Sequence, residues 1–135
     1  MARIALLVAL GALTVGCADR LPDQDLRILD ATPVAKISSD LLWKDYAADA
    51  KAADKRYWGK AIEMSGRIST VIPEAPARLM FLPERDAKNG IEARLLDDKA
   101  KDTLAGANAG ERITLRCFSE GMQQGNVILK SCVKP

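Results

Sequence analysis

The hydrophobic pattern of the chain changes period near Lys60, and no other feature constrains the fold as strongly. Beyond this residue Ile62, Met64, Gly66 and Ile68 alternate with polar or charged side chains. A period of two places every second side chain on one face of a β-strand. Gly66, in the middle of this run, is expected to mark a bend or a bulge. The second half of the chain is therefore predicted to form a sheet with one buried face.

Further short apolar runs follow, and turn signals separate them. Residues 78–82, 91–95, 113–117 and 127–132 are predicted strands, and the segment 97–110 fits a short helix with Ala100 and Leu104 facing inward. Three strands, a helix and two more strands are the layout of the OB-fold, a small five-stranded barrel. We therefore predict a mainly β fold with α, in which a five-stranded OB-fold barrel occupies residues 60–132.

A helix is predicted to precede this barrel, over residues 38–58. Ser38 is a good N-cap and Asp40 places a negative charge in the first turn. Asp49 is a candidate break within the helix. One helical face carries the apolar and aromatic residues Leu42, Tyr46, Ala50 and Ala53.

The N-terminus has the composition of an export signal. Arg3 precedes the apolar stretch 4–15, which is shorter than the roughly 20 residues that span a bilayer but suits a signal peptide. The sequence that ends in Val15-Gly16-Cys17 resembles a bacterial lipobox, which implies that Cys17 is lipidated and becomes the mature N-terminus. Secretory cleavage after Ala18, or a buried N-terminal helix with an incidental cysteine, are the alternatives.

This interpretation divides the chain into three parts. Residues 1–16 are the predicted lipoprotein signal peptide, residues 17–36 the lipidated N-terminus with a flexible tether, and residues 37–135 the OB-fold domain. Within the tether, Leu26, Ile28 and Leu29 are candidates for local docking. Ala18, rather than aspartate, follows the cysteine. By resemblance to Gram-negative lipoproteins, this implies an anchor in the outer membrane, facing the periplasm.

Cys117 and Cys132 raise the question of a metal site, a redox pair or a structural disulfide. Export would place them in an oxidising compartment. A zinc site needs four ligands, and because the chain has no histidine and Cys17 would carry lipid, only these two cysteines remain. Their spacing is not that of a Cys-x-x-Cys redox motif. A disulfide is the leading interpretation. A tight hairpin centred near Met122 would, however, separate the pair by more than about 15 Å, against a limit of about 7 Å, so buried free thiols are the alternative.

Three local motifs resemble the tRNA-anti-like OB-fold family found in many short bacterial lipoproteins. They are the helix end ADKRYWGK at 53–60, the strand segment Gly66-Arg67-Ile68, and GERIT at 110–114, with a cysteine pair after it. The resemblance covers roughly residues 37–132. It implies the fold and the envelope location and implies no particular activity.

The sequence offers no constellation of catalytic residues. Without histidine it lacks the commonest general base and the commonest metal ligand, and it has no glycine-rich phosphate loop. We therefore expect no enzymatic activity, no cofactor and no metal. A formal net charge of +2 is too small to attract nucleic acid or an anionic membrane by its field alone.

The expected function is that of a non-catalytic binding or accessory module for a periplasmic protein or glycan. OB barrels usually bind across strands 2 and 3 and the flanking loops. On that basis the candidate partner-binding residues are Arg67, Arg78, Met80 and Arg94, with the expected loop residues Phe118, Met122 and Gln123.

Two alternatives stay open. Single-stranded nucleic-acid binding is disfavoured, because such sites need stacking aromatic residues and only Phe81 and Phe118 lie in or beside predicted strands. The other alternative is an inhibitor or immunity-type protein of an exported enzyme.

Overall fold

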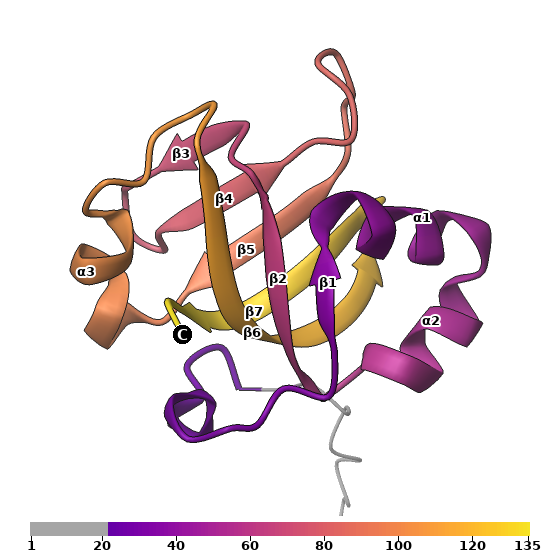
Figure 1. The fold of residues 1–135 in the computed structure, drawn as a ribbon, viewed down its shortest axis with the longest axis horizontal. Coiled ribbons are helices and arrows are strands. Elements are labelled where there is room, and N and C mark those ends of the chain that lie inside the picture. The colour runs from indigo at the N-terminus through magenta and orange to yellow at the C-terminus, as the bar shows by residue number, and fades with distance from the viewer. Residues whose placement is uncertain (1–21) are drawn as a thin grey trace, which may run out of the picture.

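The structure, a computed structural model, describes residues 22–135. The predicted signal peptide and the predicted lipidation site at Cys17 lie outside these residues. The described part is mainly β and also contains helices, as expected (Figure 1).

Seven strands form one sheet in the order β1-β2-β6-β7-β5-β4-β3. The strands are β1 (Lys36–Ser38), β2 (Ala61–Arg67), β3 (Thr70–Ile72), β4 (Arg78–Phe81), β5 (Ile91–Leu95), β6 (Arg112–Gln123) and β7 (Asn126–Val133). The helices are α1 (Ser39–Ala48), α2 (Ala50–Tyr57) and α3 (Ala100–Leu104), with 3-10 turns η1 (Leu26–Leu29) and η2 (Asp97–Lys99). Helices α1 and α2 lie on one side of the curved sheet and α3 on the other (Figure 1).

The sheet is open and has seven strands, whereas the sequence predicted a five-stranded barrel. The predicted first strand is divided into β2 and β3, which pair with β6 and β4 respectively. Between them the Ile68 amide donates to the Glu111 carbonyl, and the next amide, of Ser69, donates to the Met80 carbonyl, both at 2.8 Å. Consecutive peptide groups thus bond to the residue just before β6 and to β4, which lie far apart in the sheet order, so the chain turns its corner at these two residues.

Gly66 is not the bulge that its position suggested. The pairing of β2 with β6 runs through Gly66 without a register shift, with Ile113 directly opposite. A Cβ atom at this position would instead collide with the Ser39 side chain at the start of α1 and would lie 3.1 Å from the Phe81 ring. Glycine is required here because α1 approaches the strand closely.

The single helix expected over residues 38–58 is two helices. Asp49 has extended backbone angles, φ −160° and ψ 97°, and its side chain accepts a hydrogen bond from the Ala52 amide at 3.1 Å. It therefore ends α1 and caps α2, as aspartate favours. Ser38 caps α1 as expected, because its hydroxyl accepts from the Leu41 amide at 3.2 Å.

The expected tether does not extend over residues 22–36, which pack against the sheet. Ile28 is fully buried in a second apolar cluster that also contains Ala61, Leu96, Phe118 and Val133. The Arg116 guanidinium donates to the carbonyls of Ile28 and Leu29 at 2.8 and 2.9 Å. Strand β1 then pairs in parallel with β2. Burial of an isoleucine and satisfied backbone carbonyls hold this segment in place.

The main core lies between the sheet and its helices and is mostly aliphatic, with Tyr46, Tyr57 and Phe81 as its aromatic members. Ala100 and Leu104 of α3 pack against it, as the sequence predicted. Its fully buried members include Leu42, Ile62, Met64, Leu79, Ile91, Leu115 and Leu129.

A disulfide joins Cys117 of β6 to Cys132 of β7, with the Cα atoms 4.3 Å apart. The objection to this bond came from a misplaced turn. The hairpin turns at Gln124 and Gly125, whose φ angles of 50° and 85° suit a type I′ turn, and not near Met122. With Met122 paired to Val127, the register brings Cys132 beside Cys117.

Candidate partner-binding surface

The outer surface of β3, β4 and β5 is a ladder of half-buried and exposed side chains. The strand register aligns Thr70, Met80 and Glu92 in one row. Ile72, Arg78 and Arg94 form the next row. The alternate residues of these strands point to the core. We call this surface the β3–β5 face, and it consists of Thr70, Ile72, Arg78, Met80, Glu92 and Arg94.

One carboxylate organises the charges of the β3–β5 face. Glu92 accepts a hydrogen bond from Arg94 Nε at 3.1 Å through one oxygen, which also lies 2.9 Å from Arg94 Nη2. Its other oxygen forms an ion pair with Arg78 Nε at 3.2 Å. The group carries a formal charge of +1, and each arginine is left with N–H donors beyond those that Glu92 uses. Met80 adds an apolar, adaptable contact beside them. The face can therefore bind carboxylates, carbonyls or hydroxyls together with some apolar surface.

A shallow groove of about 280 Å³ borders the arginine end of this face. Its walls include Arg78 and Arg94 and also Asp23, Gln24 and Pro76. The docked N-terminal segment thus helps to form the surface, which no pattern within the strands could indicate.

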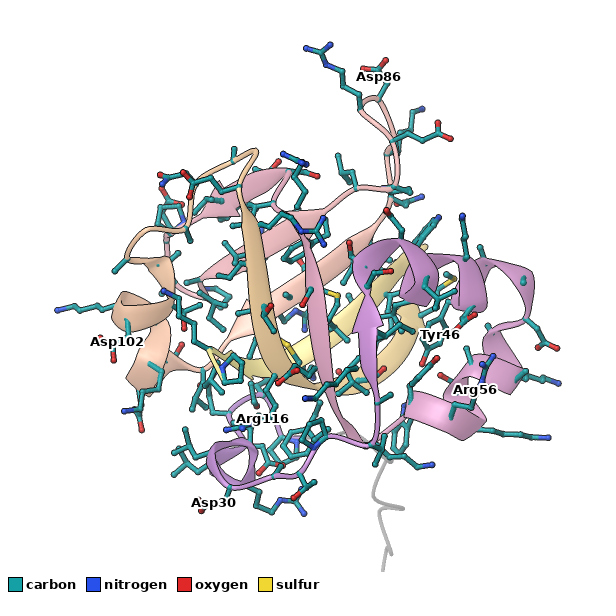
Figure 2. All side chains as sticks on the ribbon, in the orientation of Figure 1. Asp30, Tyr46, Arg56, Asp86, Asp102 and Arg116 are labelled. Carbon is teal, nitrogen blue, oxygen red and sulfur yellow. A yellow bond between two sulfur atoms is a disulfide. The ribbon has the colours of Figure 1, made fainter. Side chains whose placement is uncertain are left out.

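A groove of about 530 Å³ lies at the corner between β2 and β3. Arg67 lines it and donates to the Gly110 carbonyl at 2.6 Å. Thr70 belongs both to this groove and to the β3–β5 face, so the two are continuous. Figure 2 shows Asp86 at the tip of the long β4–β5 loop, which projects beyond the sheet. We call this depression the Arg67 groove, lined by Arg67, Ile68, Ser69, Thr70, Leu82, Pro83, Glu84, Arg85 and Gly110.

Four of the seven candidate residues lie together, and the other three do not. Arg67, Arg78, Met80 and Arg94 lie on the β3–β5 face or in the adjoining groove. Phe118, Met122 and Gln123 were expected in a loop but belong to β6, which is longer than predicted.

The side chain of Phe118 is only 7% exposed, beneath the N-terminal segment and 5.7 Å from the Arg27 guanidinium. It is therefore not available at the surface. Met122 packs against the main core and Gln123 is exposed at the hairpin turn. Sequence reasoning also missed Glu92, although its alternation with Ile91 and Ala93 placed it on the outer face.

A buried charged cluster lies on β6 and β7, below the N-terminal segment. Lys130 and Glu120 are 5% and 6% exposed, and Lys130 Nζ lies 2.6 Å from a Glu120 oxygen and 2.8 Å from Asp23 Oδ1. Burial alone would lower the pKa of Lys130, but its hydrogen bond to Asp23 and its contact with Glu120 outweigh it and raise the pKa. This cluster fastens the exposed Asp23, which also lines the groove beside the β3–β5 face, to the sheet, whereas Lys130 and Glu120 themselves are buried.

The described residues contain no metal-binding group and no spanning helix. Over residues 22–135 no three side chains of histidine, cysteine, aspartate or glutamate are placed to hold a metal ion. No helix in that range has the length and apolar character needed to cross a membrane.

Comparison with known proteins supports the family and the fold. A crystal structure from Klebsiella pneumoniae, described as that of a candidate nucleic acid-binding lipoprotein, superposes with a TM-score of 0.57 and 10% sequence identity, over 81% of this chain and 95% of that chain. At such low identity the likeness concerns the fold alone. Among curated proteins none shows significant similarity. The family model described as tRNA_anti-like matches residues 2–133, almost the whole sequence, and this protein therefore belongs to the tRNA_anti-like family.

Proposed function

We propose that this protein is a non-catalytic envelope lipoprotein whose β3–β5 face binds a periplasmic protein or glycan. The observation that carries the proposal is the pair Arg78 and Arg94 held on Glu92, with Met80 beside them. The apolar N-terminus that ends in Cys17 supports export and lipidation, with the outer membrane as the anchor. The similar fold of the Klebsiella pneumoniae protein, which is described as a lipoprotein, agrees with that location.

The chemistry of the face favours a protein or a glycan over a polyphosphate. Glu92 already neutralises half of the charge of the two arginines, so a phosphate would compete with an existing carboxylate. The face carries no aromatic residue on which a base could stack. Guanidinium N–H groups do bind the carbonyl and carboxylate groups of a protein and the hydroxyl groups of a sugar.

Single-stranded nucleic-acid binding is the second candidate, and one feature favours it. Arg67 pairs across β2 and β6 with Arg112, and Arg85 lines the Arg67 groove with Arg67. Three arginines near one groove could follow a phosphate backbone, and the similar lipoprotein is described as a candidate nucleic acid-binder. Such binding would weaken steeply with salt.

In-cell photo-crosslinking tests the proposal. A photo-reactive residue replaces Met80 or Ile72, which leaves every charge of the face in place, and a control replaces the exposed Lys51 of α2. We expect the same protein or glycan adduct from positions 80 and 72 and none from position 51. Adducts that form only from position 51 would move the function to the helices.

Charge variants sharpen this test. Arg78→Ala combined with Arg94→Ala should abolish the adduct from position 72, whereas Lys51→Ala should leave it unchanged. An adduct that survives the double variant would contradict recognition by the arginine pair. If the partner is an exported enzyme bound in one tight stoichiometric complex, the protein is of the inhibitor or immunity type.

A further inference from the structure

The exposed large apolar side chains of the described residues are concentrated in one segment. Leu26, Leu29 and Val34 are 56%, 39% and 60% exposed. Leu41, on α1, is the other member of this class within residues 22–135, at 51%. Single exposed apolar residues are ordinary, but three within nine residues call for a partner. We call Leu26, Leu29 and Val34 the N-terminal apolar patch.

The backbone beneath this patch is held firmly on the sheet. Ile28, between two members of the patch, is fully buried, and Arg116 binds the carbonyls of Ile28 and Leu29. The Val34 amide donates to the Ala61 carbonyl at 2.9 Å. The exposed side chains are therefore presented by a fixed segment, and apolar groups held in that way lose little conformational freedom on binding.

The length of chain before the patch limits its distance from Cys17. Cys17 is nine residues before Leu26 in the sequence. A chain extends by at most about 3.6 Å per residue, so the Cα atoms of these residues are no more than about 32 Å apart. Acyl chains on Cys17 would place that residue at the membrane surface, and the patch could not move far from the same surface.

We propose that the N-terminal apolar patch lies against the lipid headgroup region, where it acts as a second contact beside the acyl anchor. This inference rests on the proposed lipidation of Cys17. Charged residues of both signs stand beside the patch residues in the sequence, among them Arg27, Asp30 and Lys36. Apolar contact rather than attraction to anionic lipid therefore binds it.

The contact fixes the orientation of the whole domain. Figure 2 shows Asp30, next to the patch, at the end of the molecule opposite Asp86. With the patch on the membrane, the β4–β5 loop points away from it, and so does the part of the Arg67 groove formed by residues 83–85 of that loop. The domain then presents this groove to the aqueous space.

Fluorescence quenching in vesicles tests the orientation. The acylated protein, purified from membranes, is incorporated into phosphatidylcholine vesicles with brominated acyl chains. Cys17 is acylated and the other two cysteines are paired, so a single added cysteine carries the label. We expect strong quenching for labels at Leu29→Cys and Val34→Cys, and none for labels at Asp86→Cys and Lys51→Cys.

A matched variant separates the patch from the anchor. The patch variant combines Leu26→Ser, Leu29→Ser and Val34→Ser, and the control variant carries Leu41→Ser. Both carry a label at Asp30→Cys. We expect the bromolipid quenching of this label to be lower in the patch variant than in the control by at least about half. All four serines replace exposed side chains, so both variants should keep the thermal stability of the parent protein in detergent.

Three results would overturn the inference, and they are distinguishable. If intact mass shows acyl chains on Cys17, yet labels at 29 and 34 respond to an aqueous quencher as much as the label at 86, the patch does not contact lipid and the proposed anchor stands. If the mass shows no acyl chain, both the anchor and the membrane contact are wrong. Protection of position 29 by a crosslinked protein would also overturn the lipid contact.

Discussion

Lys130 and Glu120 form an ion pair, and the loss of either residue should lower the free energy of unfolding of the whole domain. The pair is buried, and Lys130 also binds Asp23 of the N-terminal segment. Removing one partner from a buried ion pair leaves the other charge without compensation, which costs more than the pair itself contributes. The cluster is therefore a test of how firmly the N-terminal segment is fastened.

We predict that Lys130→Met lowers the free energy of unfolding by about 3–5 kcal/mol. The control is Lys36→Met, because Lys36 is exposed and its nitrogen lies 3.8 Å from a Glu63 oxygen. This change should cost less than about 1 kcal/mol. Urea unfolding of the domain, produced without acylation, measures both. Equal effects of the two substitutions would show that the buried cluster has no special role.

Replacing Gly66 by alanine should change the stability of the protein in the direction opposite to that of most such substitutions. Replacing a strand glycine by alanine commonly stabilises a protein by about 0.4–1 kcal/mol, because alanine restricts the unfolded chain. At Gly66 the new Cβ would collide with Ser39, so Gly66→Ala should instead destabilise by about 1–3 kcal/mol.

The rescue variant is Ser39→Gly, which removes both Ser39 atoms that the new Cβ meets. In that background Gly66→Ala should cost at least about 1 kcal/mol less, as measured by a double-mutant cycle from thermal unfolding. Additive effects would contradict close approach of α1 as the reason for glycine.

At the scale of elements, the sequence predicted the strands and helix starts that follow from local residue patterns. It missed the features that depend on contacts between residues far apart in the chain. The alternation from Ile62 onward located β2, and the capping preference of Ser38 located the start of α1. Strand alternation also placed Arg78, Met80 and Arg94 on one outer face. These are local properties of the chain, which propensity and pattern can report.

The docking of the N-terminal segment could be predicted only as a candidate local contact of Leu26, Ile28 and Leu29 within an expected tether. Its prolines and aspartates are typical of a linker, and Ile28 is buried only because Ala61, Leu96 and Phe118 meet around it. The β6–β7 turn was misplaced for a related reason. The turn was expected near Met122, whereas Gln124, a residue with no strong turn preference, adopts the positive φ that the hairpin requires.

The disulfide joins β6 to β7, and its contribution can be measured directly. It closes a loop with a sequence separation of 15, which in the chain-entropy model stabilises a protein by about 3 kcal/mol. We predict that the free energy of unfolding falls by about this amount when a reductant is added to the parent protein.

The variant with Cys117→Ala and Cys132→Ala controls for effects of the reductant, to which its stability should not respond. Intact mass of the untreated parent should be lower by two hydrogen masses than that of the reduced protein. A parent protein without this mass difference would show that the two thiols are free, and the stability of such a protein would not depend on reductant.

At the scale of the molecule, the distribution of charge separates the two candidate functions. The full chain has a formal net charge of +2, and the arginines of the β3–β5 face are already paired with Glu92. A partner that binds this face displaces few counterions. Nucleic acid in the Arg67 groove would displace one for almost every phosphate that an arginine contacts.

We therefore predict that the affinity for the crosslinked partner falls by less than about tenfold when salt rises from about 50 to 200 mM, as expected for about two screened contacts. The measurement is a fluorescence titration at several salt concentrations.

Glu92→Gln should steepen the salt dependence, because it leaves both arginines without their carboxylate. Arg67→Ala combined with Arg112→Ala should leave it unchanged, because neither residue belongs to the β3–β5 face. If instead a single-stranded oligonucleotide binds with a steep salt dependence that this double variant removes, the Arg67 groove is the binding site and the protein is a nucleic-acid-binding module.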